Sequence, residues 1–297
     1  MSILIDQKTK VLIQGITGGE GSRACKEMLS YGTKILAGVT PGKGGQFVEG
    51  VAVYDTVAEA LFNHPEINTS LIAVPAAFLK DAASEVIFGG IPLIDILTEL
   101  VPTQDSAWVV ALAKLKNVRV VGPASVGILS PGKAKIGSIG SGGISDLFSA
   151  GFVGVISKSG GMTAEISSML TRHGLGQSTV IGIGGDQIIA SDFADILKLF
   201  ADDEETKAVV LFGEVGGTYE EQAAEFIKKS GFKKPVVAII AGRFSELLPQ
   251  ETVLGHAGAI VAKGRGSYDS KVDALKDAGV MVASTLEEIP DLLKSKM

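Results

Sequence analysis

The sequence predicts an α/β chain made of two doubly wound domains. Short apolar runs alternate with amphipathic stretches along most of its 297 residues, a pattern typical of parallel strands joined by crossover helices. Glycine accounts for 38 residues, roughly twice its usual share of about 7%, and the glycines cluster after β-branched runs, where a buried strand turns sharply into a helix. The hydrophobic fraction of 46% is ample for packed cores, and the length suits two domains of ordinary size.

The first half of the chain is expected to form one parallel sheet. Its apolar runs predict strands at Val11–Ile16, Lys34–Val39, Leu71–Val74, Leu93–Leu97 and Arg119–Val121. The amphipathic stretches between them predict helices at Glu20–Ser30, Val57–Phe62 and Ala107–Leu115. Each strand is followed by Gly, Pro or Thr, as expected where a strand ends in a tight turn.

The pattern loosens between Gly122 and Gly151, where Pro, Gly and Ser dominate. We expect this stretch to connect the two domains, with the boundary near residue 128. The alternation then resumes, with strands expected at Phe152–Ile156, Thr179–Ile183, Ala208–Phe212, Pro235–Ile240 and Val280–Ala283. Helices are expected at Met162–Arg172, Ala194–Phe200, Glu220–Lys229, Lys271–Asp277 and Leu286–Lys294. Binding sites are expected at the carboxyl ends of the strands of both sheets.

Composition excludes several classes of protein. The formal net charge of −6 offers no basic surface for nucleic acid or for an anionic membrane. No apolar run approaches the roughly 20 residues of a membrane helix. The single cysteine, Cys25, cannot form an internal disulfide, and the cysteine and histidines lack the spacing of metal ligands. We therefore expect a soluble cytoplasmic protein with no nucleic-acid or membrane partner and no metal site.

The first strand is followed by a glycine-rich turn that carries Gly15, Gly18, Gly19 and Gly21. Backbone N–H groups in such a turn can approach a phosphate at the start of a helix. The spacing departs from G-x-G-x-x-G, and the second strand is followed by Lys43 rather than by the acidic residue that an NAD site requires. This pattern favours a phosphorylated nucleotide such as coenzyme A (CoA) over NAD. A purely structural turn with a solvated lysine remains the alternative.

Four strand ends in the second half carry small or polar residues that parallel strands would bring to one crevice. They are residues 157–161, 184–186 and 213–217, and the loop that runs from Gly242 to Gly258. Ser159, Gly160 and Gly161 begin a helix, so their N–H groups suit an anion.

His256 is the candidate nucleophile at this crevice, because small neighbours leave its ring room to react. An imidazole is nucleophilic near neutral pH when an acceptor fixes its other nitrogen, and Glu214 is the candidate acceptor. The other histidines, His64 and His173, are expected at the surface. A structural His256 and a solvated Glu214 remain alternatives to a catalytic pair.

Several longer motifs identify a family. They read MSILID, QGITG, YGTKILAGVTPGKGG, LTELVP, GQSTVIGIGGD, GEVGGTYEEQAAEFIK and GHAGAI in chain order. With them the chain resembles, over essentially its whole length, the α subunit of succinyl-CoA synthetase and the superfamily of ADP-forming acyl-CoA ligases. The resemblance implies a Rossmann-like CoA-binding domain over residues 1–128 and a flavodoxin-like ligase domain over residues 129–297.

The resemblance also implies roles for single residues. His256 would be phosphorylated transiently, Glu214 would hydrogen-bond its ring, and Ser159, Gly160 and Gly161 would stabilise the phosphate. ATP and Mg would bind an ATP-grasp β subunit in a hetero-oligomer, because the chain has no P-loop. The residues implied to line the CoA site are Thr17, Gly18, Gly19, Glu20, Lys43, Leu97, Thr98 and Glu99.

Two motifs depart from the succinate enzymes. Residues 157–165 read SKSGGMTAE, where succinyl-CoA synthetases read SRSGTLTYE, so Gly161 and Ala164 replace larger side chains and widen the substrate pocket. These residues and GPASVG at 122–127 resemble the matching parts of ATP-citrate lyase. The expected enzyme is therefore a citryl-CoA synthetase subunit, with succinate–CoA ligase as the alternative. A non-catalytic CoA-binding module is a weaker alternative, because both His256 and Glu214 are present, and the missing acidic residue disfavours an NAD-dependent dehydrogenase.

Overall fold

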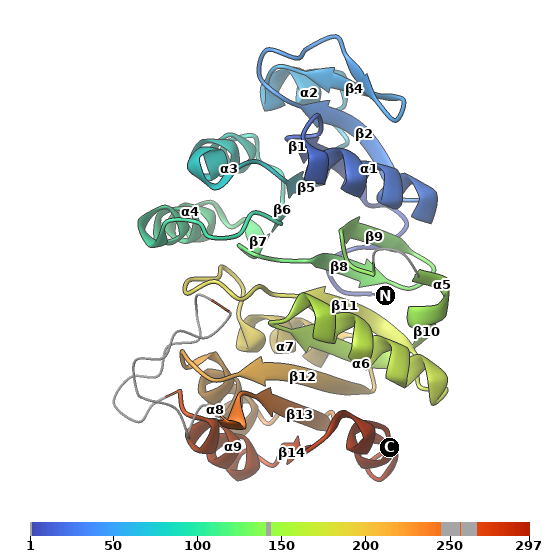
Figure 1. Cartoon of the computed structure of the whole chain (residues 1–297), viewed down its shortest axis with the longest axis vertical. Helices are drawn as coiled ribbons and strands as arrows, with labels where there is room; N and C mark the ends of the chain where they lie inside the picture. The colour runs from blue at the N-terminus through green and yellow to red at the C-terminus, as the bar shows by residue number, and fades with distance from the viewer. Residues whose placement is uncertain (1, 141–143, 245–255, 257–265) are drawn as a thin grey trace.

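The computed structural model describes residues 2–140, 144–244, 256 and 266–297. These residues form two seven-stranded sheets stacked along the long axis of the molecule (Figure 1). The first sheet has the order β3-β4-β2-β1-β5-β6-β7, and the second has the order β14-β13-β12-β10-β11-β8-β9. The predicted α/β class with two doubly wound domains is confirmed.

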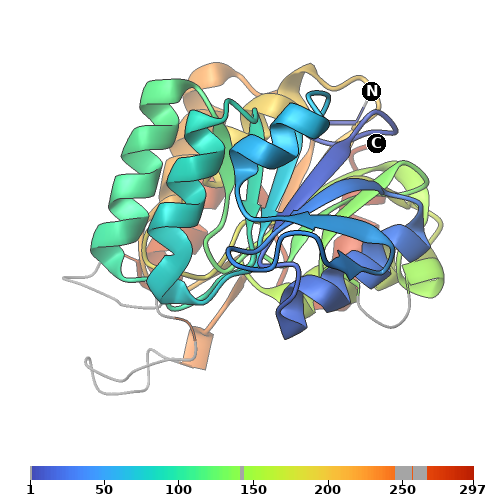
Figure 2. The same ribbon diagram turned by 90° about the horizontal axis from the view of Figure 1, so that it is seen from above.

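The first sheet is parallel except for β3, which pairs antiparallel with β4. Helices α3 and α4 lie on one face of this sheet and α1 lies on the other (Figure 2). The chain reverses its direction of travel across the sheet between β1 and β5, so a crevice opens at their carboxyl ends. The strands are β1 (Lys10–Gln14), β2 (Lys34–Val39), β3 (Phe47–Val48), β4 (Val51–Tyr54), β5 (Thr69–Ile72), β6 (Leu93–Ile96) and β7 (Arg119–Val121). The helices are α1 (Gly19–Tyr31), α2 (Val57–Asn63), η1 (Ala76–Phe78), α3 (Leu79–Phe88) and α4 (Thr103–Lys116).

The second sheet is parallel from β10 to β14, and a hairpin extends it in the antiparallel sense. Its strands are β8 (Gly127–Ser130), β9 (Ala134–Gly137), β10 (Ala150–Ser157), β11 (Gln177–Gly182), β12 (Ala208–Glu214), β13 (Val236–Ala241) and β14 (Met281–Val282). Its helices are α5 (Ile144–Leu147), α6 (Gly160–Arg172), α7 (Phe193–Asp202), α8 (Tyr219–Ser230), α9 (Tyr268–Asp277), η3 (Leu286–Glu288) and α10 (Ile289–Lys294). No helix in these described ranges is long and apolar enough to cross a membrane.

The structure corrects the expectation of an irregular connection between Gly122 and Gly151. Strands β8 and β9 form a hairpin there that pairs with β11 and belongs to the second sheet. Glycine enables this pairing rather than preventing it, because a Cβ atom at Gly127 would lie 2.0 Å from the carbonyl oxygen of Ile136. Gly127 also has a φ of +116°, which side chains other than hydrogen rarely allow. The glycines therefore mark a close approach of two strands.

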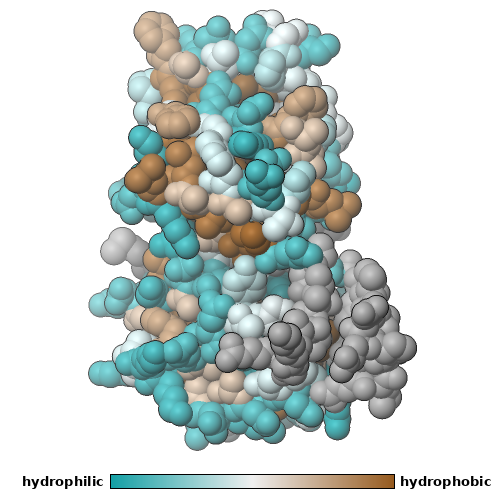
Figure 3. Space-filling view, turned by 90° about the vertical axis from the view of Figure 1, so that its left-hand side faces the viewer, coloured by the Kyte–Doolittle hydropathy of each residue, from teal (hydrophilic) through white to brown (hydrophobic). Residues whose placement is uncertain are grey.

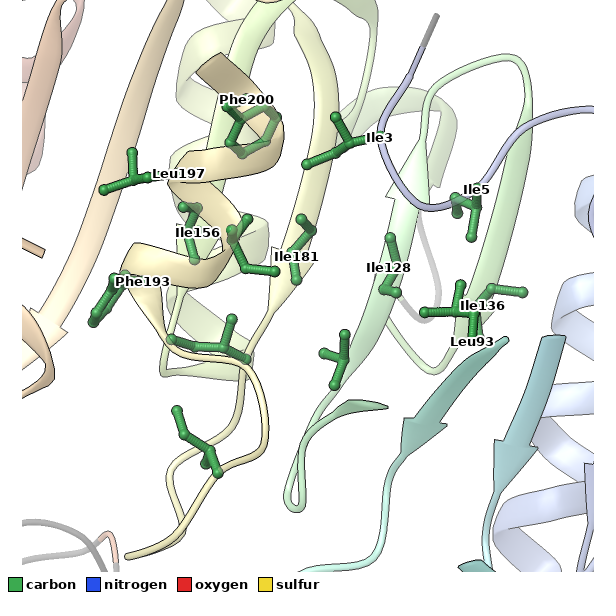
Figure 4. Close-up of a cluster of buried hydrophobic side chains, with 14 of the residues drawn as sticks. Ile3, Ile5, Leu93, Ile128, Ile136, Ile156, Ile181, Phe193, Leu197 and Phe200 are labelled. Atoms are coloured by element: carbon green, nitrogen blue, oxygen red, sulfur yellow. The ribbon is translucent and has the colours of Figure 1, made fainter. Parts of the chain in front are cut away.

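One of the apolar clusters runs continuously from one domain into the other. Ile5 and Leu93 of the first domain pack in one cluster with Ile128 and Ile136 of the hairpin (Figure 4). The cluster continues through buried residues of β10, β11 and α7, among them Phe200. Each fully buried side chain of this kind contributes about 1.5–3 kcal/mol, so the core opposes separation of the domains.

A buried ion pair reinforces the same junction. Lys135 of β9 is fully buried, and its Nζ donates to Oε2 of Glu27 in α1 at 2.8 Å. The backbone N–H of Lys135 also donates to Thr33 Oγ1, and the Thr33 hydroxyl donates to the Lys135 carbonyl. These bonds fix the position of the hairpin relative to α1.

Candidate active site

His256 and Glu214 meet at the carboxyl edge of the second sheet. Glu214 ends β12, and its Oε2 lies 2.6 Å from Nδ1 of His256. The Glu214 side chain is only 12% exposed, whereas that of His256 is 38% exposed. Because the carboxylate engages Nδ1, Nε2 is the ring nitrogen left for chemistry.

A glycine after β11 makes room for the imidazole. A Cβ atom on Gly185 would lie 2.9 Å from Nδ1 and 3.0 Å from Cγ of His256, which is closer than real Cβ contacts allow. Position 185 must therefore lack a side chain for His256 to reach Glu214. The glycine pattern predicted small residues at this edge, and the structure shows what one of them does.

Lys158 is a site residue that the sequence reasoning did not assign a role. It follows β10 directly, its side chain is 1% exposed, and its Nζ lies 3.2 Å from Oε1 of Glu214. Glu214 is therefore held between two cationic or hydrogen-bonding groups, Lys158 on one oxygen and His256 on the other. A lysine placed between an apolar strand and a glycine-rich helix start was the signal available in the sequence.

The charges around this pair shift both pKa values. Burial acts to raise the pKa of Glu214, but the hydrogen bond with His256 and the charge of Lys158 outweigh it and hold that pKa below its ordinary value. The hydrogen bond to Glu214 raises the pKa of His256, while burial and the charge of Lys158 oppose the rise. The charge of Asp186, which follows β11, adds to it. The pair therefore favours an ionised carboxylate beside a basic imidazole.

The start of α6 lies next to this pair, because Lys158 immediately precedes its cap residue Ser159. No side chain caps this helix, so its first N–H groups remain available to an anion. Gly160 is required by packing, since a Cβ atom there would lie 2.3 Å from Cγ1 of Val126. The space around Gly161 is open within 4 Å, and Ala164 is half-buried on the same helix. The substrate and phosphate roles of these residues stay predictions.

The crevice between β1 and β5 holds a cavity of about 700 Å³. Thr17 and Gly18, both predicted CoA contacts, line it, and the Thr17 hydroxyl donates to that of Thr40. Gly19, Glu20 and Lys43 are exposed and are not among its lining residues. The sequence reasoning missed the apolar wall of this cavity. The residues that follow β2 and β5 were the place to look for it, because ligands bind where the chain reverses its direction across such a sheet. This wall comprises Val39, Pro41, Val74, Pro75 and Phe78.

The remaining predicted CoA contacts lie on the loop after β6, between the two sites. Leu97 and Thr98 are half-buried and Glu99 is exposed, and the Thr98 hydroxyl donates to the carbonyl of Val74. The same loop reaches the second domain, since the N–H of Val101 donates to Asp186 Oδ2 at 3.4 Å. The structure therefore places this loop between the cavity of the first domain and the His256 edge of the second.

Other nucleophilic and metal chemistry finds little support in the described residues. Burial, with a smaller contribution from Glu49, raises the pKa of Cys25 to about 11, so its thiol is un-ionised at neutral pH. Among the residues with described positions, no group of three or more His, Cys, Asp or Glu side chains could hold a metal ion. The loop around His256, including the expected Gly255, Ala257 and Gly258, lies outside the described residues.

The site thus combines a cavity of about 700 Å³ in one α/β domain with an ion-paired histidine in the other. Residues 6–100 match the model of the CoA binding domain, and residues 156–281 match that of CoA-ligase. The succinate–CoA ligase [ADP-forming] subunit alpha 2 of Archaeoglobus fulgidus is 47% identical over 293 residues, which is 99% of each chain. The corresponding alpha subunit of Staphylococcus aureus (strain COL) is 45% identical over 99% of this chain and 94% of that one.

Among solved structures, ATP citrate lyase of Methanosaeta concilii in complex with (3S)-citryl-CoA superposes with a TM-score of 0.91 at 26% identity. The match covers 99% of this chain and 50% of the lyase chain. An acetyl-coenzyme A synthetase of Ca. Korarchaeum cryptofilum shares the fold, with a TM-score of 0.76 at 21% identity. The chain belongs to the CoA-ligase family, alongside the alpha subunits of succinate–CoA ligase. The family and the enzyme class expected from the sequence are confirmed.

Proposed function

We propose that the chain is the α subunit of an ADP-forming succinate–CoA ligase. The observation that carries the proposal is the 45–47% identity to such subunits over nearly the whole chain, joined to a His256–Glu214 pair in contact at 2.6 Å. This reverses the order of substrates expected from the sequence. Citrate ranked first there on two small side chains and on the GPASVG motif at 122–127, but the likeness to ATP citrate lyase is only 26%.

His256 is the residue that carries the phosphoryl group in this proposal. Nε2 attacks the γ-phosphorus of ATP and ADP leaves; Nδ1–H stays on the ring and donates to Glu214, which stabilises the positive charge that develops. The phosphoryl group then passes from Nε2 to a carboxylate oxygen of the acid. The CoA thiolate attacks the acyl phosphate carbon, phosphate leaves, and the thioester forms. Each step exchanges one reactive bond for another of similar energy.

Two features of the chain support its binding of CoA in the first domain. The cavity of about 700 Å³ has apolar walls suited to a base and is bordered by the Thr17-Gly18 turn, whose N–H groups suit a phosphate. Lys43 is exposed on the neighbouring glycine loop and is free to meet a further phosphate. Thr98 and its neighbours on the loop after β6 would lie beside the thiol end.

A partner subunit completes the proposed enzyme. The relatives are alpha subunits by name, and we infer an ATP-grasp β subunit that binds ATP and Mg. The first domain exposes several large apolar side chains, and the face in Figure 3 carries more apolar surface over that upper half than over the described part of the lower half. Such patches mark protein interfaces in many proteins. The side chains include Phe62, Phe78, Phe88 and Leu100.

The test is reconstitution with the β subunit, followed by CoA-ligase assays on a panel of carboxylates. We expect ADP release beyond the first turnover to depend on CoA and on succinate, with kcat/KM for succinate above that for citrate. Citrate is the second candidate because the space around Gly161 is open. Citrate would be established instead if its kcat/KM exceeded that for succinate and if Ala164→Tyr lowered the kcat/KM for citrate.

A further inference from the structure

Three groups from three different elements form a continuous chain at the carboxyl edge of the second sheet. Lys158 follows β10, Glu214 ends β12, and His256 comes from the loop before α9. The ammonium lies 3.2 Å from one carboxylate oxygen, and the imidazole lies 2.6 Å from the other. Lys158 is almost wholly buried, so solvent screens this chain weakly.

The Glu214–His256 pair alone has two opposing effects on the imidazole, and Lys158 changes the balance between them. A carboxylate that orients an imidazole also raises its affinity for a second proton. The doubly protonated ring has no lone pair on Nε2 and cannot accept a phosphoryl group. A cation on the far side of the carboxylate draws its charge away from the ring and repels the second proton, while the orienting hydrogen bond remains.

We propose that Lys158 is a positioning residue for phosphoryl transfer: its ammonium fixes Glu214 and opposes the uptake of a second proton at Nε2 of His256. This inference rests on the proposed function of His256. The described ion pairs of Lys158 are with Glu214 and Glu220 rather than with the histidine, so it acts on His256 through Glu214. The direction of its effect agrees with the site, since the charge of Lys158 lowers the pKa of His256.

The neighbouring charges leave Lys158 directed at Glu214. Glu220 of α8 lies 3.9 Å from Lys158, and its other oxygen is ion-paired with Lys271 of α9. The ring of Tyr219 lies 5.9 Å from the ammonium. Asp186, in the loop after β11, acts on His256 in the opposite sense to Lys158. Among the residues with described positions, the charged groups around Lys158 and His256 include Glu214, Glu220, Glu221, Lys271 and Asp186.

A purely structural ion pair is the alternative reading of Lys158. Buried ion pairs are poor stabilisers, because replacing both charges by apolar groups is often neutral or favourable. A role confined to stability predicts that losing Lys158 changes the melting temperature and leaves the titration of His256 unchanged. A positioning role predicts that the titration moves.

The experiment uses the full chain and measures the titration of His256 and the rate of its phosphorylation. The pKa of His256 is determined by NMR titration of its ring, and the rate of phosphate transfer from labelled ATP is measured against pH in the complex with the β subunit. The variants are Lys158→Met, Lys158→Arg and Lys135→Met. Lys135 is a matched control, since it is a fully buried lysine that pairs with Glu27 at the domain junction.

We expect Lys158→Met to raise the pKa of His256 by about one unit and to slow phosphorylation roughly tenfold at pH 7. Part of the rate should return as pH rises, because the ring then loses its second proton. Lys158→Arg should retain the wild-type profile, and Lys135→Met should leave the His256 titration in place. Lys158→Gln replaces the methionine variant if the latter does not fold.

An unmoved titration and pH profile in folded Lys158→Met or Lys158→Gln would overturn the inference. An equal shift in Lys135→Met would overturn it as well, because the effect would then be general to buried lysines. Failure of the proposed function is distinguishable: the wild-type complex would then place no acid-labile phosphate on His256, whatever residue occupies position 158.

Discussion

Asp95 is a buried carboxyl group whose pKa lies far above its ordinary value. This residue of β6 is fully buried, and burial raises its pKa to about 7 against the opposing hydrogen bond with Ser125. Oγ of Ser125 lies 2.7 Å from Oδ1 of Asp95 and 2.7 Å from the carbonyl oxygen of Gly182, and accepts from the N–H of Gly127. A hydroxyl has one proton, and a carbonyl can only accept. The Ser125 hydroxyl can therefore donate to only one of these two oxygens at a time, and burial keeps the Asp95 carboxyl group un-ionised up to a pKa of about 7.

This state predicts a pH-dependent stability that Asp95→Asn removes. The folded-state pKa lies above the unfolded value, so the native chain binds the extra proton and its stability falls as pH rises from about 4 through about 7. A shift of about three units corresponds to at most about 4 kcal/mol. Urea unfolding should show that the free energy of unfolding of Asp95→Asn, relative to that of the wild type, is higher at pH 8 than at pH 5. An equal difference at both pH values would contradict the protonated carboxyl.

Glu214→Gln tests the orienting carboxylate at the same scale. The amide keeps the size of the side chain and a hydrogen-bond acceptor, but it removes the charge that stabilises the developing imidazolium and leaves Lys158 without its partner. We expect labelled phosphate to enter His256 about 100-fold more slowly, with an unchanged melting temperature to within a few degrees. Glu221→Gln is the control, since Glu221 bonds Lys271 and Ser270 instead. Equal rates in the two variants would contradict the role of Glu214.

At the scale of elements, the loop after β6 stores backbone strain. Leu100 has a φ of +55°, a left-handed conformation that costs a non-glycine residue about 1–2 kcal/mol. Hydrogen bonds from the Leu100 and Val101 N–H groups to Asp186 hold the loop in this form. The carboxylate of one domain therefore fixes a loop of the other, and that loop carries Thr98 and Glu99.

We expect Asp186→Ala to weaken this loop without removing His256 from the reaction. The value of kcat/KM for CoA should fall about five- to thirtyfold, in line with a strain of about 1–2 kcal/mol, while labelling of His256 by ATP persists. Leu100→Gly in the same chain should restore most of the loss, because glycine adopts a positive φ without cost. Absence of rescue would show that Asp186 acts in some other way.

The positions of the strands that carry the site were predictable from sequence, but the order of those strands in the sheet was not. Apolar runs located β10, β11, β12 and β13 to within a few residues, and their polar ends pointed to one crevice. The order of strands depends on helix crossovers that no local pattern encodes. Because β12 lies between β10 and β13, Lys158 reaches Glu214 across one strand spacing. The β8–β9 hairpin escaped prediction because glycines that allow close strand contact have the composition of a loop.

At the scale of the molecule, the continuous core predicts that the two domains unfold together. The cluster that includes Ile5, Leu93, Ile128 and Ile156 spans both sheets, so separating them exposes side chains worth about 1.5–3 kcal/mol each. Calorimetry of the full chain should show one transition with equal calorimetric and van't Hoff enthalpies. Two resolved transitions would mean that the junction is too weak to couple the domains.

Gly185 controls the space that is available to the His256 ring. Its φ is not in the left-handed region, so alanine is compatible with the backbone, yet the added methyl carbon would lie only 2.9 Å from Nδ1 and would displace the imidazole from Glu214. Gly185→Ala should therefore yield a folded chain that binds CoA and its partner while His256 takes up phosphate more slowly. Such a subunit would compete for assembly as a dominant inhibitor. A homologue with both motif residues intact and a larger residue here would be a pseudoenzyme that motif inspection mistakes for a ligase.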